Sequence, residues 1–159
     1  MQEEYGASSS AKRPDLISAL GVLTFVNTGA FILIYGIGAL GMLQVRALPF
    51  EQFEQMLNEG VLRYMQPDQV EQLAVIAPIF YYNGLALMLI YLARTVLRLA
   101  GAIAMWRGRK VGFHLYAAAQ LLGIFAPHIV LPWAFLGVLG PLATVATTAV
   151  YGTQLKRLR

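Results

Sequence analysis

Two arginines, Arg94 and Arg98, stand four residues apart within a long run of apolar residues that extends to Trp106. Residues at that spacing share one face of an α-helix, and Tyr91 falls on the same face. A guanidinium within a bilayer costs about 2.5 to 3.5 kcal/mol, so we expect it to face the bundle interior, water or a partner. The pair is therefore the first candidate for chemistry, and that chemistry is contact with an anion, a lipid phosphate or another subunit.

The sequence offers these arginines no carboxylate at their own depth, because the acidic residues gather in the N-terminal tail and in residues 44–72. Three interpretations stay open. The side chains can extend toward the cytoplasmic headgroups or bond to backbone carbonyls, they can bind an anion or a lipid, or they can meet an acidic residue of another subunit.

The two histidines, His114 and His128, are the other residues that could bring chemistry into the apolar segments. They lie fourteen residues apart on one predicted helix, about 21 Å along its axis, so they cannot ligate the same ion. The sequence has no cysteine, no phosphate-binding glycine loop, no GxSxG and no HExxH. We therefore expect no catalytic residues, no metal and no cofactor.

The elements that carry these residues are predicted to be membrane-spanning helices. Hydrophobic residues make up 58% of the 159, only 13% are charged, and the mean hydropathy is +0.60. The net charge of +4 does not indicate nucleic acid, because the basic residues sit at the ends of apolar runs. About 20 apolar residues span a bilayer, so the sequence predicts an all-α, four-helix transmembrane bundle with spans at residues 14–43, 73–106, 113–130 and 133–152.

The second span holds both arginines, so its continuity matters. One interpretation ends it near Ala93 and lays residues 96–106 in the membrane interface. We favour a continuous helix to Trp106, because residues 99–105 are apolar all round and offer no charged face to an interface.

Polar and small residues inside the spans are predicted to hold the helices together. Asn27 and Gln120 are mid-span amides, which in membrane bundles usually hydrogen-bond to neighbouring helices. Gly36 and Gly38 would let another helix approach closely, since they lack a side chain.

Residues 44–72 form the largest water-facing segment, which is acidic. Apolar residues recur in it at helical steps, which predicts a short amphipathic helix that packs on the bundle or on a partner subunit. The residues of this stripe that we expect to face a partner are Phe50, Phe53, Leu57 and Tyr64. We expect Pro67 to end this helix, and the next to begin near Gln69 behind a capping box of Asp68 and Glu71.

The remaining segments set the topology. Residues 1–13 are predicted to be a disordered tail without a cleavable signal peptide, and residues 107–112 and 153–159 are a basic turn and a basic tail. With four spans, eight of the twelve Lys and Arg residues face one compartment, which makes both termini cytoplasmic. Four aromatic residues fall near predicted span boundaries, as in an aromatic belt: Trp106, Tyr116, Trp133 and Tyr151.

The stretch GAIAMWRGRKVGFHLYAAAQ, residues 101–120, resembles a pattern in small uncharacterised four-span bacterial membrane proteins, especially from the Bacteroidota. There, a span ends in Met-Trp, a basic turn follows, and the next span opens with Gly-Phe, Tyr and Gln. The resemblance implies only the four-span fold and its topology, and it brings no activity and no site residue. Separately, we expect a multi-pass protein of the bacterial inner membrane.

Taken together, these features predict a non-catalytic structural or accessory subunit of a membrane complex. Unpaired arginines, small residues and an apolar stripe all look incomplete in a monomer, so we expect membrane lipids and other subunits, or further copies of the chain, as partners. The alternative is a small oligomeric channel or transporter for an anion or lipid, with Arg94 and Arg98 along its path.

Overall fold

The computed structural model describes residues 15–60 and 62–158, and all regular secondary structure in them is helical. The predicted all-α class is therefore confirmed, while the tail predicted at residues 1–13 lies outside the described residues. The five α-helices are α1 (Asp15–Val45), α2 (Phe50–Gly60), α3 (Pro67–Trp106), α4 (Val111–Phe125) and α5 (Leu139–Gly152). Three short 3-10 helices lie in the connections, η1 (Leu62–Tyr64), η2 (Ala126–Ile129) and η3 (Trp133–Phe135), and a fourth, η4 (Leu155–Arg157), follows α5.

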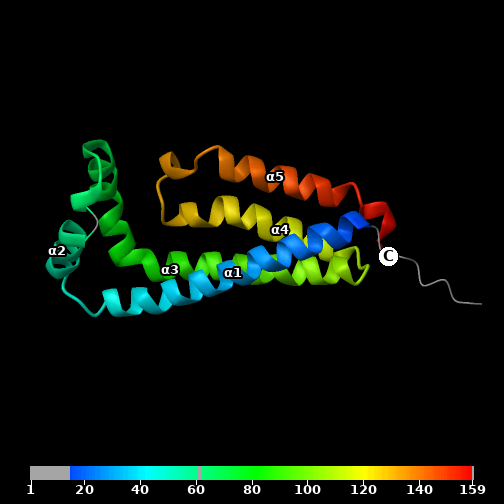
Figure 1. Ribbon diagram of the computed structural model, residues 1–159, viewed down its shortest axis with the longest axis horizontal. Helices are drawn as coiled ribbons and strands as arrows, with labels where there is room; N and C mark the ends of the chain where they lie inside the picture. Colours follow the sequence, from blue (N-terminus) through cyan, green and yellow to red (C-terminus); the bar gives the residue numbers. More distant parts are fainter. Residues whose placement is uncertain (1–14, 61, 159) are drawn as a thin grey trace, which may run out of the picture.

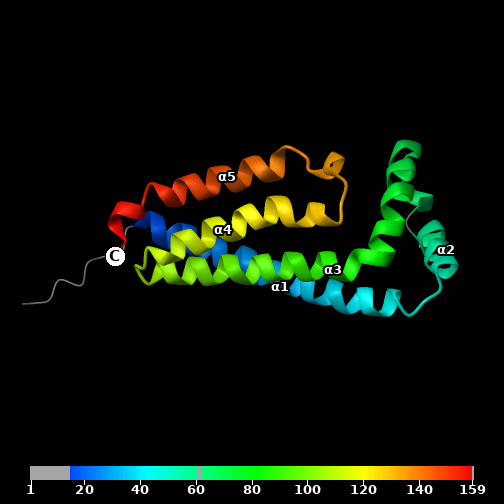
Figure 2. The same ribbon diagram turned by 180° about the vertical axis from the view of Figure 1, so that it is seen from behind.

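Helices α1, α3, α4 and α5 run up and down along the molecule, so that each is antiparallel to the one before it (Figure 1). The start of α1 and the end of α5 lie at the same end, and α2 lies at the opposite end (Figures 1 and 2). Helix α1 packs along α3, α3 along α4, and α4 along α5. The first and last helices of this row also contact each other, because the side-chain hydroxyls of Thr24 on α1 and Tyr151 on α5 form a hydrogen bond of 2.9 Å.

Helix α3 is continuous from Pro67 to Trp106, as the sequence predicted, and it does not end near Ala93. The first part of α3 bends away from the axis of the rest of the helix, which runs alongside α1 (Figures 1 and 2). We attribute the bend to Pro78, the proline inside the helix, because a proline removes one main-chain hydrogen bond and its ring displaces the preceding turn.

Helix α3 begins close to the predicted Gln69, but its capping box and the role of Pro67 differ from the prediction. Its N-cap is Gln66, whose backbone N–H donates to Oε1 of Gln69 at 3.2 Å in a reciprocal capping box. Pro67 opens α3 and does not end the preceding helix, which already stops at Gly60. A proline suits the first turn because the N–H it lacks would have no partner there.

The apolar stripe of α2 packs on α3 of the same chain. The ring centroids of Phe50 and Phe53 lie 5.0 and 5.4 Å from that of Tyr81, and Phe50 also stacks on Tyr82 at 6.0 Å. The Tyr81 hydroxyl donates to the carbonyl of Leu48 at 2.7 Å, which fastens the α1–α2 connection to α3.

This packing corrects the expectation that the stripe faces a partner. Leu57 lines a small cavity with residues of α3, Leu73 and Ala74 among them, and Phe53 is buried. Only Tyr64, which is 79% exposed, is left open among the four residues of the predicted stripe. The sequence could not predict that α2 packs on its own chain, because this packing depends on the bend that brings the first part of α3 against α2.

We expect Phe53→Ala to free α2 from α3, because Phe53 is the buried residue of the helix and truncating a buried Phe costs about 3 to 5 kcal/mol. Hydrogen exchange at the amides of α2 should rise at least about tenfold. Met56→Ala, at a position 58% exposed on the same helix, is the control and should leave exchange unchanged. Equal exchange in the two variants would contradict this packing.

The last two helices are shorter than the predicted spans. Helix α4 ends at Phe125 and passes into η2, which contains Pro127, and α5 begins only at Leu139, not near residue 133. Pro132 caps η3, and Gly137 takes a left-handed φ of +62°, a conformation that favours glycine. Among the described residues, α1 and α3 are the two helices long and apolar enough to cross a membrane.

The buried core lies where all four long helices meet, near the end that carries the start of α1. Its members are Ala102, Met105, Tyr116, Tyr151 and Leu158, with Leu20, Phe25 and Phe113 packed against it. Tyr116 and Tyr151 are each 2% exposed and their ring centroids lie 4.8 Å apart, so placing these two tyrosines in an aromatic belt was wrong. Their hydroxyls find hydrogen-bond partners inside the protein and need no water.

Glycines mark the closest helix contacts, although not all of those predicted. A Cβ at Gly38 would lie 2.8 Å from Sδ of Met88 on α3, in agreement with close packing there. A Cβ at Gly36 would meet nothing within 4 Å among the residues that the structure describes, so the expected packing role of Gly36 is not found there. The backbones of α3 and α4 approach each other closely at Gly101 and Gly112, where a Cβ would lie 2.7 and 2.5 Å from backbone nitrogens of the other helix.

Candidate functional site

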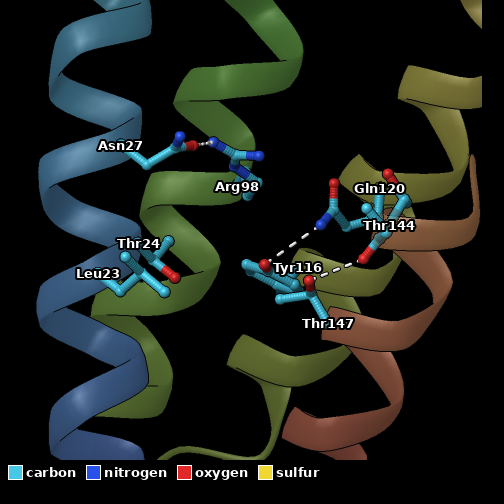
Figure 3. A pocket seen from close by; sticks show the side chains of 9 residues that line it. Leu23, Thr24, Asn27, Arg98, Tyr116, Gln120, Thr144 and Thr147 are labelled. Atoms are coloured by element: carbon cyan, nitrogen blue, oxygen red, sulfur yellow. Dashed lines mark hydrogen bonds between the residues drawn. The ribbon is translucent and has the colours of Figure 1, made fainter. Parts of the chain in front are cut away.

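A polar cavity of about 260 Å³ opens between α1, α3, α4 and α5 (Figure 3). Asn27 and Arg98 lie on one side of it and Thr144 and Thr147 on the opposite side, with Tyr116 between them (Figure 3). The residues that line it are Leu23, Thr24, Asn27, Arg98, Tyr116, Gln120, Ala143, Thr144 and Thr147. We call it the Arg98 cavity.

Arg98 is held in this cavity by a neutral partner. Its Nη2 donates to Oδ1 of Asn27 across the α1–α3 contact. Its Nε is buried and has no hydrogen-bond partner. Asn27 is a neutral partner, so it does not offset the positive charge of the guanidinium.

Arg94 is also held by an amide, on a different helix. Its Nη2 donates to Oε1 of Gln120 on α4 at 2.9 Å, and Nε2 of Gln120 donates to the Tyr116 hydroxyl at 3.2 Å. Gly123 makes room for this guanidinium, because a Cβ there would collide with it. The Nε of Arg94, like that of Arg98, is buried without a partner.

The two arginines open into different cavities, although they stand four residues apart on one helix. Arg94 lines a second cavity, of about 280 Å³, together with Tyr91, His128 and residues of η2, η3 and α5. We call it the Arg94 cavity. Tyr91 stacks on Tyr35 of α1 at 5.3 Å, and the His128 ring stacks on Trp133 at 4.7 Å. Thr144 lines both cavities and so lies between them.

The charge of this interior is positive. The lining of the two cavities includes both guanidinium groups and, over the described residues, not one carboxylate. Asn27 and Gln120 orient the arginines but cannot cancel their charge. Nor do the described residues include a group of three or more His, Cys, Asp or Glu placed to hold a metal ion.

Sequence reasoning found Arg94, Arg98, Tyr91, Asn27 and Gln120, but it did not foresee how they combine. The amides do bridge helices as predicted, yet each bridges to an arginine. Thr144 and Thr147 were not predicted as site residues. Their spacing could have indicated them, because threonines at 144, 147 and 148 recur at helical spacing. His128, for which the sequence predicted no site role, also lines the Arg94 cavity.

Comparison with known proteins adds no relative: no family model, no curated protein and no solved structure matches this chain. The resemblance of residues 101–120 to small four-span bacterial membrane proteins therefore stays a prediction. The function has to be argued from the cavities and their charge.

Proposed function

We propose that the chain is a four-span protein of the bacterial inner membrane, with α1, α3, α4 extended by η2, and α5 as its spans. Only 17% of the residues in the apolar windows of α1 and α3 are buried, whereas the core helix of a soluble protein would be mostly buried. Lipid is the natural cover for the rest. The basic α3–α4 turn lies at the same end of the bundle as the end of α5, after which η4 carries Lys156 (Figure 1), and this supports cytoplasmic termini.

We further propose that this protein binds an anionic group in the Arg98 cavity and serves as a small channel or transporter for an anionic solute or lipid. The observation that carries the proposal is the Arg98 guanidinium, which lines an open cavity and has the neutral amide of Asn27 as its partner. An anion entering there would accept a charge-assisted hydrogen bond and offset the cost of the buried charge.

The surrounding residues have complementary roles in this proposal. Asn27 fixes the direction of the guanidinium, and Thr144 and Thr147 on the opposite wall offer hydroxyls to the same anion. Arg94 is a second contact point, reached past Thr144 and Gln120. Two successive cationic contacts, neither of them paired with a carboxylate among the described residues, suit binding that has to be followed by release.

The channel or transporter is favoured over the accessory subunit as the role of this protein. The stripe of α2 packs on its own chain and the arginines have amide partners, so two of the features that called for a partner subunit are explained within the chain. The accessory role stays as the second candidate. It is favoured by Tyr64 and Met56, which are 79% and 58% exposed on the segment outside the bundle.

Thermal unfolding of the purified protein tests the anion site. Inorganic phosphate and dodecyl phosphate are added in turn, and we expect at least one to raise the unfolding midpoint, since a ligand at 100 times its Kd stabilises by about 2.7 kcal/mol. Arg98→Gln should lose most of that shift. Arg46→Gln removes an exposed arginine between α1 and α2 and should keep it. Equal shifts in both variants, or no shift with either probe, would refute the anion site.

A further inference from the structure

An apolar groove lies beside the Arg98 cavity, between α4 and α5. Its volume is about 340 Å³ and almost all of its exposed lining is apolar. Phe113, Ala117 and Leu121 line it from α4, and Val145 and Ala149 from α5.

The groove and the Arg98 cavity meet at two residues. Gln120 and Thr144 line both, so the polar and apolar spaces adjoin across the α4–α5 contact. A ligand that occupied both would need one charged end and one apolar end, joined at this point.

The groove also opens to the outside of the bundle. Leu121 and Val145 in its walls are 55% and 57% exposed. In a membrane this outer surface faces lipid chains, so a molecule already dissolved in the bilayer can enter sideways. Arg98 lies eight residues from the end of α3, about 12 Å along its axis, which is within the hydrocarbon layer for a spanning helix.

We infer that the ligand of the Arg98 cavity is an amphiphile with an anionic head group, a phosphate or a carboxylate, and a hydrocarbon tail. The head group contacts Arg98 and the threonines of α5, and the tail lies in the α4–α5 groove. This inference rests on the proposed function and deepens it by naming the class of ligand. A free inorganic anion would contact only the Arg98 guanidinium, and bulk lipid would then fill the adjoining groove.

The test uses the full chain in phosphatidylcholine nanodiscs and three probes: dodecyl phosphate, inorganic phosphate and dodecanol. Dodecyl phosphate should bind at least about tenfold tighter than either of the others, a difference of about 1.4 kcal/mol. Ala149→Trp, which fills the groove at an exposed alanine, should weaken dodecyl phosphate at least about tenfold. Ala146→Trp, at an exposed alanine of α5 outside the groove lining, is the matched control and should bind as the wild type does.

The outcomes separate this inference from the proposal beneath it. Equal affinity for dodecyl phosphate and inorganic phosphate, with no effect of Ala149→Trp, would overturn the amphiphile and leave an anion site standing. Equal affinity for dodecanol and dodecyl phosphate would overturn the role of the charged head group. If no probe binds the wild-type protein, both the inference and the proposed function fail.

Discussion

Gly101→Val is expected to separate α3 from α4 and to cost about 3 kcal/mol, the upper part of the range for an overpacked core. A Cβ at position 101 would lie 2.7 Å from the backbone nitrogen of Tyr116 and 2.9 Å from the carbonyl oxygen of Gly112. These are main-chain atoms, which cannot turn aside as the end of a flexible side chain would. The helices must therefore move apart, and the core around Met105 and Tyr116 opens with them.

The measurement is the midpoint of unfolding in detergent, followed by circular dichroism, for Gly101→Val and for Gly36→Val. Both substitutions place the same residue inside a long helix, so helix propensity changes equally. A Cβ at Gly36 meets nothing within 4 Å, so this variant should stay within about 0.5 kcal/mol of the wild type. Similar losses in the two variants would mean that helix propensity, and not the α3–α4 contact, decides the result.

Gly36→Val has a second use. If Gly36 packs against another copy or another subunit, native mass spectrometry of this variant will show a reduced copy number at unchanged monomer stability. That result would restore the packing role that the sequence indicated for Gly36, now between chains. An unchanged copy number would leave it a lipid-facing residue.

The helices could be predicted from the sequence because apolar runs longer than about 20 residues leave little choice of structure. The interruptions were harder to interpret. Pro78 leaves α3 continuous but bends it, and the residues before the bend, Leu73 and Ala74 among them, line a cavity with Leu57 of α2. A local rule identifies the proline, whereas the direction of the bend and what it covers depend on the tertiary fold.

The candidate site was predictable where short connections fix the register. The α3–α4 turn is only four residues long, so Gly101 has to lie opposite Gly112 and Tyr116, and Arg94 opposite Gln120. No such argument places Asn27 opposite Arg98, because α2 and its connections intervene between α1 and α3. Arg94 and Arg98 share one face of α3, which suggested a common site, yet they line different cavities. Long guanidinium side chains can reach to either side of the helix that carries them.

The pairing of Arg94 with Gln120 makes the second large prediction. Gln120→Leu takes away the acceptor of the guanidinium and leaves a half-buried charge with neither Nη2 nor Nε satisfied. Removing one partner from a buried charged group costs about 3 to 5 kcal/mol, and we expect a loss near 3 kcal/mol because the partner is neutral. The Tyr116 hydroxyl loses the amide that donates to it in the same step.

Adding Arg94→Met to Gln120→Leu should recover most of that loss, because the double variant removes the stranded charge and fills the space with an apolar chain of similar length. Equilibrium unfolding of the wild type, the two single variants and the double variant, all without ligand, gives the coupling energy. A coupling above about 1.5 kcal/mol is expected for a contact made inside the bundle. Additive losses would mean that Arg94 contacts lipid headgroups or water instead of Gln120. The Arg94 cavity would then not be part of an anion path.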